Sequence, residues 1–293
     1  MKKNYPRNMI GYGSKTPSVK WPNGAKIALQ IVLNYEEGSE NSILHGDKTS
    51  ETFLSEIIGA QPIKGRHINM ESFYEFGSRR GFWRLHYLFQ EKKIPITIFG
   101  VGMALERNKD VCDAIKESDY EVASHGWRWI DYQKIPKATE KKHMQLAIQS
   151  IKKIFGKRPL GWYTGRCSPN TRDLVMEEGG FLYDSDSYSD DLPYWITKGK
   201  KKQLIIPYTL DNNDMRFATN QGFNSGDQFF TYLKDSFDAL YEEGNTNPKM
   251  MSVGLHCRLI GRPGRIQSLK KFLDYVLKHD DVWLCKRIDI AKH

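Results

Sequence analysis

Apolar residues follow two different spacings along this chain, and the two spacings alternate. Short apolar runs predict strands at 26–34, 96–101, 120–123, 160–163, 181–183, 204–206, 250–255 and 282–284. Between them, apolar residues recur every three to four positions, which predicts amphipathic helices. These helices are expected at 83–93, 111–115, 138–155, 171–178, 229–241 and 266–277, with a short helix closing the chain.

Strands separated by helices imply right-handed crossovers and a parallel sheet. About eight such units favour an α/β fold, a distorted (β/α) barrel formed by a single domain over residues 1–293. An open doubly wound sheet is the alternative, although the first predicted strand is not followed by the GxGxxG of a dinucleotide-binding fold. Residues 39–78 form a long excursion with few periodic signals, which we expect to wall a functional site or to make an oligomer contact.

The excess of positive charge does not point to a nucleic acid. The chain has 44 Lys and Arg against 35 Asp and Glu, a formal net charge of +9. The lysines are scattered in short runs such as 141–142 and 198–202, whereas a nucleic-acid-binding surface gathers them on one element. We therefore expect a solvated basic surface, an exposed loop at 198–202, and no nucleic-acid or membrane partner.

The cysteines and the first residues favour the cytoplasm. Cys112, Cys167, Cys257 and Cys285 form no CxxC pair, which is typical of a reducing compartment. Met1-Lys2-Lys3 is not followed by the apolar core of a signal peptide. No run reaches the ~18 apolar residues of a membrane-spanning helix. We expect a cytoplasmic protein.

Unusual polar clusters begin where the predicted strands end. They lie at 34–38, 124–129, 164–166, 184–186, 211–216 and 256–258. In a parallel barrel the carboxyl ends of all strands open on one face, so residues far apart in the sequence converge on one pocket. Any one cluster has an ordinary structural explanation, but their common position predicts a functional face.

The groups at this face suit hydrolysis at a carbonyl carbon. A water nucleophile needs a base, which Glu36 or Glu37 can supply. Neighbours on an extended segment point in opposite directions, and we choose Glu36 as the base. The leaving nitrogen needs a proton, which His256 or His125 can deliver.

Further residues of these clusters are candidates for stabilising the oxyanion or binding the substrate. The developing oxyanion needs cationic or donor groups, which Arg166, Arg258 or His125 can provide. For Asp214, the alternative to a functional role is a structural ion pair with Arg216. For the tryptophans of 124–129, the alternative is a place in the hydrophobic core. The residues expected to contact substrate are Glu37, Trp129, Arg166, Asp214 and Arg258.

In their order these clusters resemble the motif series of the polysaccharide-deacetylase (NodB-homology) superfamily. Tyr35-Glu36-Glu37-Gly38 stands where that family has an Asp-Asp-Gly with the base and a metal ligand. His125 stands at the first position of its His-x-x-x-His metal motif, and Leu255-His256 at its Leu-x-His with the catalytic acid. Residues 184–186 lie near its fourth motif, whereas Thr164-Gly165-Arg166 matches its Arg-Pro motif poorly. The resemblance implies a hydrolase with a deacetylase-type barrel.

One departure from this family removes a metal ligand. Trp129 stands at the second histidine of the His-x-x-x-His motif, and an indole N–H only donates. Chelation by two histidines four residues apart needs both imidazoles. The chain is more similar to a branch of the superfamily, the cofactor-independent allantoinases, which implies no metal and no other cofactor.

The resemblance to this branch covers nearly the whole chain. It is carried by long motifs at 5–7, 10–13, 32–38, 44–48, 161–166, 190–195 and 254–263. It implies a homotetramer that hydrolyses the ring amide of (S)-allantoin to allantoate, in purine degradation, by general acid–base catalysis. Composition and spacing alone do not reach this substrate.

Other functions stay open from the sequence. A metal-dependent N-deacetylase of amino sugars or peptidoglycan is one, although Trp129 and the missing export signal count against it. A hydrolase of hydantoins or cyclic imides would use the same groups. A non-catalytic binding protein with a decayed site is a third, against which the retention of Glu36, His125 and His256 speaks.

Overall fold

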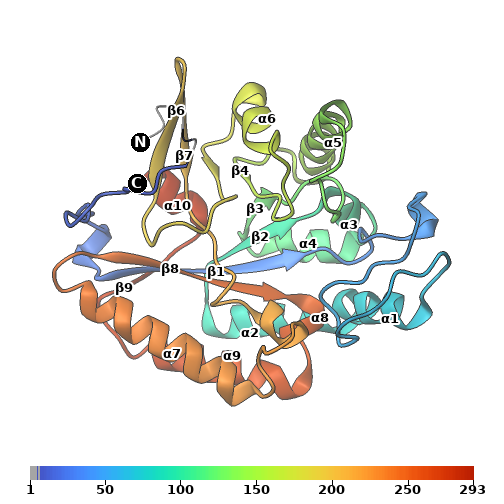
Figure 1. Ribbon diagram of the computed structural model, residues 1–293. Helices are drawn as coiled ribbons and strands as arrows, with labels where there is room; N and C mark the ends of the chain where they lie inside the picture. Colours follow the sequence, from blue (N-terminus) through green and yellow to red (C-terminus); the bar gives the residue numbers. More distant parts are fainter. Residues whose placement is uncertain (1–4, 6) are drawn as a thin grey trace.

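The computed structural model describes residue 5 and residues 7–293, so the expectation drawn from Met1-Lys2-Lys3 lies outside the described residues. Nine strands form one sheet, in the order β6-β7-β5-β4-β3-β2-β1-β8, with β9 paired to β1 (Figure 1). All pairings are parallel except β6 with β7. The strands are β1 (Ile27–Tyr35), β2 (Ile96–Gly100), β3 (Glu121–Ser124), β4 (Gly161–Trp162), β5 (Tyr183–Asp184), β6 (Tyr194–Lys198), β7 (Lys201–Ile205), β8 (Lys249–His256) and β9 (Val282–Leu284).

The sheet curls until its two ends approach each other. The chain that leaves β7 crosses toward β8, and Asn213 makes a parallel bridge with Gly254. Gly254 is required there, because a Cβ on it would overlap with the Asn213 side chain. The predicted distorted (β/α) barrel is confirmed in the form of a curled half-barrel.

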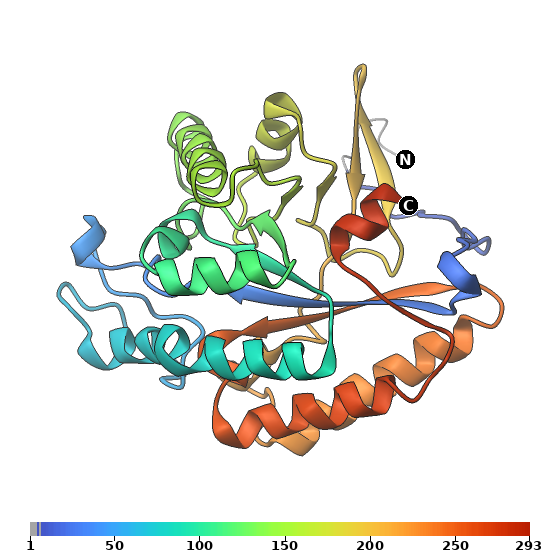
Figure 2. The ribbon, with the colours of Figure 1, turned by 180° about the vertical axis from the view of Figure 1, so that it is seen from behind.

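Helices cover the outside of this curl. Seen from the front and from behind, α2, α7 and α9 lie on one side of β1 and β8, while α5 and α6 lie on the other (Figures 1 and 2). The longer helices are α1 (Ile68–Phe76), α2 (Phe82–Lys92), α4 (Lys109–Glu117), α5 (Lys137–Phe155), α6 (Thr171–Glu178), α7 (Gly226–Glu243) and α9 (Pro263–Val276). The short ones are η1 (Pro22–Gly24), η2 (Ile43–His45), the π-turn η3 (Gly77–Gly81), α3 (Gly102–Glu106), η4 (Asp214–Ala218), α8 (Cys257–Ile260) and α10 (Arg287–Lys292).

Local sequence sets several helix ends. Asn108 caps α4 by accepting the backbone N–H of Val111 at 3.1 Å, and Ser225 likewise caps α7. Gly156 ends α5 with φ of 75°, a left-handed conformation that favours glycine. The helices predicted from apolar spacing therefore begin and end close to their expected positions.

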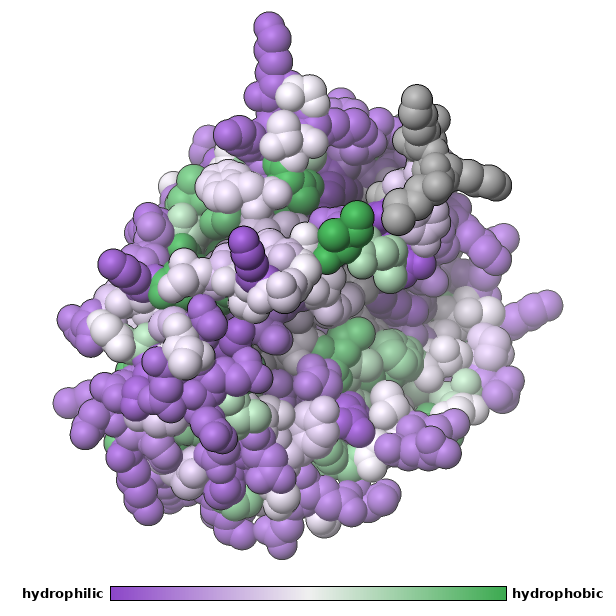
Figure 3. All heavy atoms as spheres, turned by 60° about the vertical axis from the view of Figure 1, so that its left-hand side comes forward, coloured by the Kyte–Doolittle hydropathy of each residue, from purple (hydrophilic) through white to green (hydrophobic). Residues whose placement is uncertain are grey.

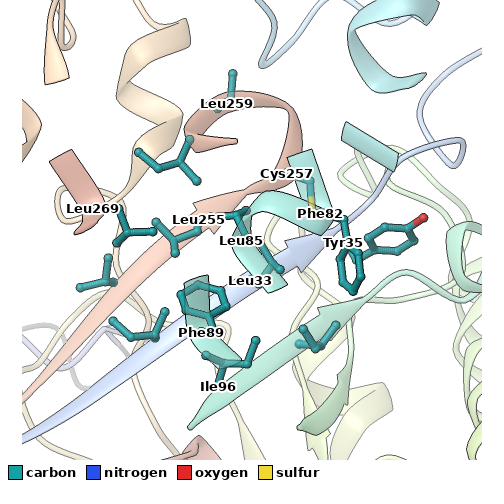
Figure 4. Packing of buried hydrophobic residues seen from close by; sticks show 14 of the residues in the cluster. Leu33, Tyr35, Phe82, Leu85, Phe89, Ile96, Leu255, Cys257, Leu259 and Leu269 are labelled. Atoms are coloured by element: carbon teal, nitrogen blue, oxygen red, sulfur yellow. The ribbon is translucent and has the colours of Figure 1, made fainter. Parts of the chain in front are cut away.

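Strand β1 carries the core on both of its faces. Its odd-numbered side chains, from Ile27 to Tyr35, pack outward against the helices, and Ala28 and Val32 pack inside the curl. Figure 4 shows the outward cluster, in which Phe82, Leu85 and Phe89 of α2 pack against β1. All nine residues of β1 are buried, which explains its nearly unbroken apolar run.

Two segments contain more secondary structure than the apolar pattern indicated. Residues 198–202 are exposed as expected, but they form the end of an antiparallel hairpin, in which Lys198 pairs with Lys201, instead of a loop alone. Exposed hairpin strands need few apolar residues, so the apolar runs did not reveal β6. The excursion at 39–78 contains η2 and α1, and it folds back so that Leu54 is buried in the core.

The hydropathy of the helices and of the molecular surface is mixed, because polar and apolar residues occur in both. Among the described residues, no helix is long and apolar enough to cross a membrane. The face in Figure 3 is mostly hydrophilic, with hydrophobic patches around a hollow near its centre.

Candidate active site

Strand register brings the ends of five strands to one level. Asn34 of β1 pairs with His256 of β8, and Tyr35 pairs with Gly100 of β2. Gly100 in turn pairs with Ser124, and Ser124 with Trp162 of β4. The residues that follow these positions therefore face the same space at the carboxyl end of the sheet.

The three residues expected to be catalytic meet in this space. One oxygen of Glu36, Oε1, lies 3.1 Å from Nε2 of His125 and 3.5 Å from Nε2 of His256. All three side chains are at most 6% exposed. A carboxylate oxygen shared by two imidazoles is thus the centre of the site.

These three residues open on a cavity of about 190 Å³. Drug-sized ligands occupy pockets of about 300–1,000 Å³, so this cavity suits a smaller molecule. Its other walls come from residues that the sequence clusters partly contained: Asn34, Phe53, Leu54, Trp129, Tyr163, Gly165, Arg166, Tyr188, Tyr208, Leu210, Asn213 and Met215.

Asp214 lies behind His256 and does not line the cavity. Its Oδ1 lies 2.6 Å from Nδ1 of His256, and its Oδ2 accepts the backbone N–H groups of His256 and Ile260 at 2.8 and 3.0 Å. The expected alternative partner, Arg216, instead stacks on Phe223 with 4.5 Å to the ring centroid. Asp214 therefore orients His256 so that Nε2 faces Glu36.

The charges around Glu36 and His256 favour an ion pair. Burial alone would raise the pKa of Glu36, but His256, Arg258 and the hydrogen bond to His125 hold it well below the usual range. Burial alone would lower the pKa of His256, but the negative charges of Glu36 and Asp214 raise it to about 9. At neutral pH the pair is therefore a carboxylate beside an imidazolium.

The side chain of Glu37 points away from that of Glu36, as expected for adjacent residues in an extended segment. Its Oε2 accepts the backbone N–H of Glu36 at 3.0 Å, and its side chain lies against Gly77, where a Cβ would overlap with it. Burial raises the pKa of Glu37. Glu37 does not line the cavity of Glu36, so direct contact with a ligand there is not available to it.

Arg166 and Trp129 lie together at the cavity. The Arg166 guanidinium is 4.9 Å from the Trp129 ring centroid, and its Nη1 is 3.4 Å from Oε2 of Glu51. Trp129 also stacks on Phe53, with centroids 6.1 Å apart and planes 6° from parallel. The tryptophan is thus both a core residue and a wall of the cavity.

Sequence reasoning did not single out the tyrosines of the cavity. Tyr163 packs on His125 with 4.8 Å between ring centroids, and its hydroxyl is 2.9 Å from that of Tyr188. The hydroxyl of Tyr208 accepts a hydrogen bond from Nδ2 of Asn34 at 2.9 Å. Tyr163 and Tyr208 each follow a strand, and that position was the available signal. Phe53, inside the excursion, gave none.

The metal implied by the resemblance to deacetylases does not fit these residues. Trp129 offers no lone pair where the second histidine would stand. The guanidinium of Arg258 lies 2.8 Å from Oε2 of Glu36, so a fixed positive charge is already beside the carboxylate. Within the part of the chain that the structure describes, no group of three or more His, Cys, Asp or Glu residues is arranged to hold a metal ion.

Comparisons with known proteins identify relatives of this chain. The family model "Polysaccharide deacetylase" matches residues 72–177. A crystal structure from Pseudomonas aeruginosa PAO1, described as a polysaccharide deacetylase, is 59% identical with a TM-score of 0.97, over 99% of this chain and 97% of that chain. The crystal structure of PuuE allantoinase is 58% identical with a TM-score of 0.97, over the same shares of the two chains.

A curated relative extends this likeness to a eukaryote. A Schizosaccharomyces pombe protein described as a polysaccharide deacetylase is 43% identical over 98% of this chain and 96% of its own length. An identity of this size over nearly the whole chain shows common descent and a common fold. This chain therefore belongs to the polysaccharide deacetylase family.

Proposed function

We propose that this protein hydrolyses the ring amide of allantoin to allantoate. The observation that carries the proposal is the single oxygen of Glu36 within 3.1 and 3.5 Å of two imidazole nitrogens, at the wall of a small cavity. This arrangement places a proton acceptor beside a proton donor. The likeness to PuuE allantoinase supports the choice of substrate.

In the first step, Glu36 accepts a proton from water as the water oxygen attacks the ring carbonyl carbon. A carboxylate with a lowered pKa is a weak base by itself. The proton on Glu36 becomes more strongly held in the second step, when the neighbouring imidazolium of His256 loses its positive charge. The oxyanion that develops on the carbonyl oxygen is stabilised by His125 and by Arg166.

In the second step, the carbon–nitrogen bond of the ring breaks. His256 donates its Nε2 proton to the leaving nitrogen, and Asp214 stabilises the correct tautomer of the imidazole. The proton held by Glu36 then returns to His256 across the 3.5 Å between them. The new carboxylic acid ionises, so the reaction consumes one water and releases one proton.

The aromatic and cationic walls suit a flat, neutral ureide. A guanidinium fork can donate to ureido and carbonyl oxygens, and Arg166 presents one at the cavity. The ring of Trp129 provides a flat surface beside it. We assign substrate binding to Arg166 and Trp129, and supporting roles to Glu37, Asp214 and Arg258, which lie behind the cavity wall.

We propose that the reaction needs no metal and no other cofactor. Glu36 and His256 supply the base and the acid, and the donor set does not fit a metal site. A metal-dependent N-deacetylase is therefore the weaker candidate. A hydrolase of hydantoins or cyclic imides would use the same groups, and the substrate test below separates it.

Three further assignments belong to the same proposal. We propose a preference for (S)-allantoin, a role in purine degradation, and a single-domain chain that assembles as a homotetramer, by similarity to the cofactor-independent allantoinases. We also propose a cytoplasmic location, because the four cysteines are all unpaired and three of them are buried.

The test uses purified, chelator-treated protein and a substrate panel. We expect hydrolysis of (S)-allantoin to continue at the untreated rate, with slower turnover of (R)-allantoin, hydantoin and dihydrouracil and none of N-acetylated chito-oligosaccharides. Loss of allantoin hydrolysis on chelation, restored by added Zn²⁺, would refute metal-free catalysis. Faster turnover of hydantoin than of allantoin would replace the proposed substrate. Light scattering reports the oligomeric state.

A further inference from the structure

Arg258 is a fully buried cation that does not line the catalytic cavity. Its Nη2 lies 2.8 Å from Oε2 of Glu36, and its Nη1 lies 3.5 Å from Oε1 of Glu37. Its Nε donates to the backbone carbonyl of Leu54 at 2.8 Å. One guanidinium therefore joins the end of β1 to a loop of the excursion at 39–78.

Two aromatic rings complete the surroundings of this guanidinium. Its central carbon is 4.2 Å from the ring centroid of Tyr74 in α1 and 5.1 Å from that of Trp129. Both distances are within the range of cation–π attraction, which is stronger away from water. Arg258 thus contacts the end of β1, the excursion at Leu54, helix α1 and the segment of Trp129.

Leu54 has an unusual backbone conformation at this contact. Its φ is 52°, in the left-handed region that residues other than glycine rarely adopt. Leu54 lines the catalytic cavity, and its carbonyl accepts the hydrogen bond from Arg258. Unfavourable backbone conformations persist only where surrounding contacts hold them, and Arg258 supplies such a contact.

We propose that Arg258 is a positioning residue that holds the Glu36 carboxylate and the cavity wall at residues 50–57 in one fixed arrangement. The inference deepens the proposed function and rests on it for the role of Glu36. Removal of the guanidinium would free Oε2 of Glu36 and the carbonyl of Leu54 together. The base and the wall would then lose their order as one unit.

The contacts require the shape of arginine as well as its charge. A guanidinium presents five N–H donors in a planar fork, whereas an ammonium is a compact point charge. A lysine at this position can reach one partner but cannot bind Glu36, Glu37 and Leu54 in three directions. Arg258→Lys therefore separates the contribution of charge from that of geometry.

The first experiment is free of substrate. Amide hydrogen exchange is measured over residues 50–57 in the parent protein, Arg258→Met, Arg258→Lys and the exposed control Arg79→Met. We expect both changes at Arg258 to speed exchange in this segment by at least about tenfold, and the control to leave it unchanged. Exchange at the parent rate in the two Arg258 variants would overturn the proposal.

The second experiment is the pH profile of kcat/KM for allantoin. The ionisable groups that face Glu36 are His125, His256 and Arg258, with Asp214 behind His256 and with Glu37 and Tyr74 beside Arg258. We expect the acid limb to move to higher pH in Arg258→Met and to stay near its parent position in Arg258→Lys, whose kcat is nevertheless reduced. Added methylguanidinium should partly restore the rate of Arg258→Ala.

The outcomes distinguish this proposal from the proposed function. If the parent protein does not hydrolyse allantoin, the exchange measurement still tests the link between Arg258 and the wall. If Arg258→Met does not fold, as circular dichroism would reveal, Arg258→Lys retains the buried charge and decides the exchange result. An unmoved acid limb in a folded Arg258→Met variant would show that Arg258 does not act on Glu36.

Discussion

Nδ1 of His256 lies 2.6 Å from one oxygen of Asp214, and the other oxygen of the same carboxylate accepts the backbone N–H of His256 at 2.8 Å. The two contacts hold both the ring and its backbone. Since Nδ1 is engaged, Nε2 is the nitrogen that faces Glu36 at 3.5 Å. This relationship turns a histidine at a strand end into an oriented proton donor.

Replacing Asp214 should therefore impair proton donation by His256 and leave substrate binding in the cavity largely intact. We expect Asp214→Asn to lower kcat for allantoin by about 10²–10⁴-fold, the usual contribution of a positioned acid or base, with a smaller change in KM. Asp211→Asn, an exposed neighbour, is the matched control. Steady-state kinetics of the two variants provide the comparison, and parent-like kcat in Asp214→Asn would contradict the proposed role.

Glutamine substitution at the two adjacent glutamates should have very different effects on activity. Glu36→Gln removes the proposed base and should reduce kcat by about 10²–10⁴-fold. Glu37→Gln should keep most of the activity, because Glu37 does not line the cavity and the amide oxygen of glutamine can still accept the backbone N–H of Glu36. Equal losses in the two variants, with both proteins folded, would leave the choice of Glu36 unsupported.

The pH dependence follows from the directions of two pKa shifts. His256 must carry its proton, and its pKa is raised to about 9, so kcat should fall only as pH rises through about 9. Glu36 must be ionised, and its pKa is held well below the usual range, so the acid limb should lie below that of an ordinary glutamate. The Asp214→Asn variant loses a negative charge, and its alkaline limb should move to lower pH. An alkaline limb near about 6.5, typical of an isolated histidine, would refute the assignment.

The guanidinium of Arg166 should contribute both to substrate binding and to stabilisation of the transition state. We expect Arg166→Met to lower kcat/KM by about 10–10²-fold, since a hydrogen bond from a charged group contributes about 1.5–3 kcal/mol. Arg166→Lys should recover little, because the planar fork is lost. The control Arg172→Lys alters a cation on the neighbouring helix α6, whose Nε pairs with Asp184 at 3.3 Å and which does not line the cavity. Similar kinetics in all variants would remove Arg166 from substrate recognition.

Close packing beneath the site gives a prediction for stability. A Cβ at Gly81 would overlap with the backbone carbonyl of Cys257, the residue before Arg258. We expect Gly81→Ala to lower the free energy of unfolding by about 1–3 kcal/mol, the usual penalty of overpacking. Gly264→Ala, at a position with open space, is the control. Urea unfolding curves measure both, and equal midpoints would contradict the expectation.

Much of the fold could be predicted from the sequence because its signals are local. The apolar run of β1 and the spacing along α5 reflect which side chains are buried, and burial follows the repeat of each element. Strand β6 and helix α1 were not predicted, since their apolar positions are few or irregular. The candidate catalytic residues were found because parallel strands place their carboxyl ends on one face.

By itself, the amino-acid sequence determined most strands, most helices and the set of polar residues at the strand ends, because these depend on repeats of a few residues. Only the tertiary structure decided which of these polar residues contact each other and which of them line the cavity. It paired Asp214 with His256 instead of Arg216, and it placed Arg258 behind Glu36 instead of in the cavity. Those pairings depend on strand register and on the way residues 39–78 fold over the site. Both bring segments that are remote in the sequence to within a few ångströms of each other, and the spacing of apolar residues carries no information about such contacts.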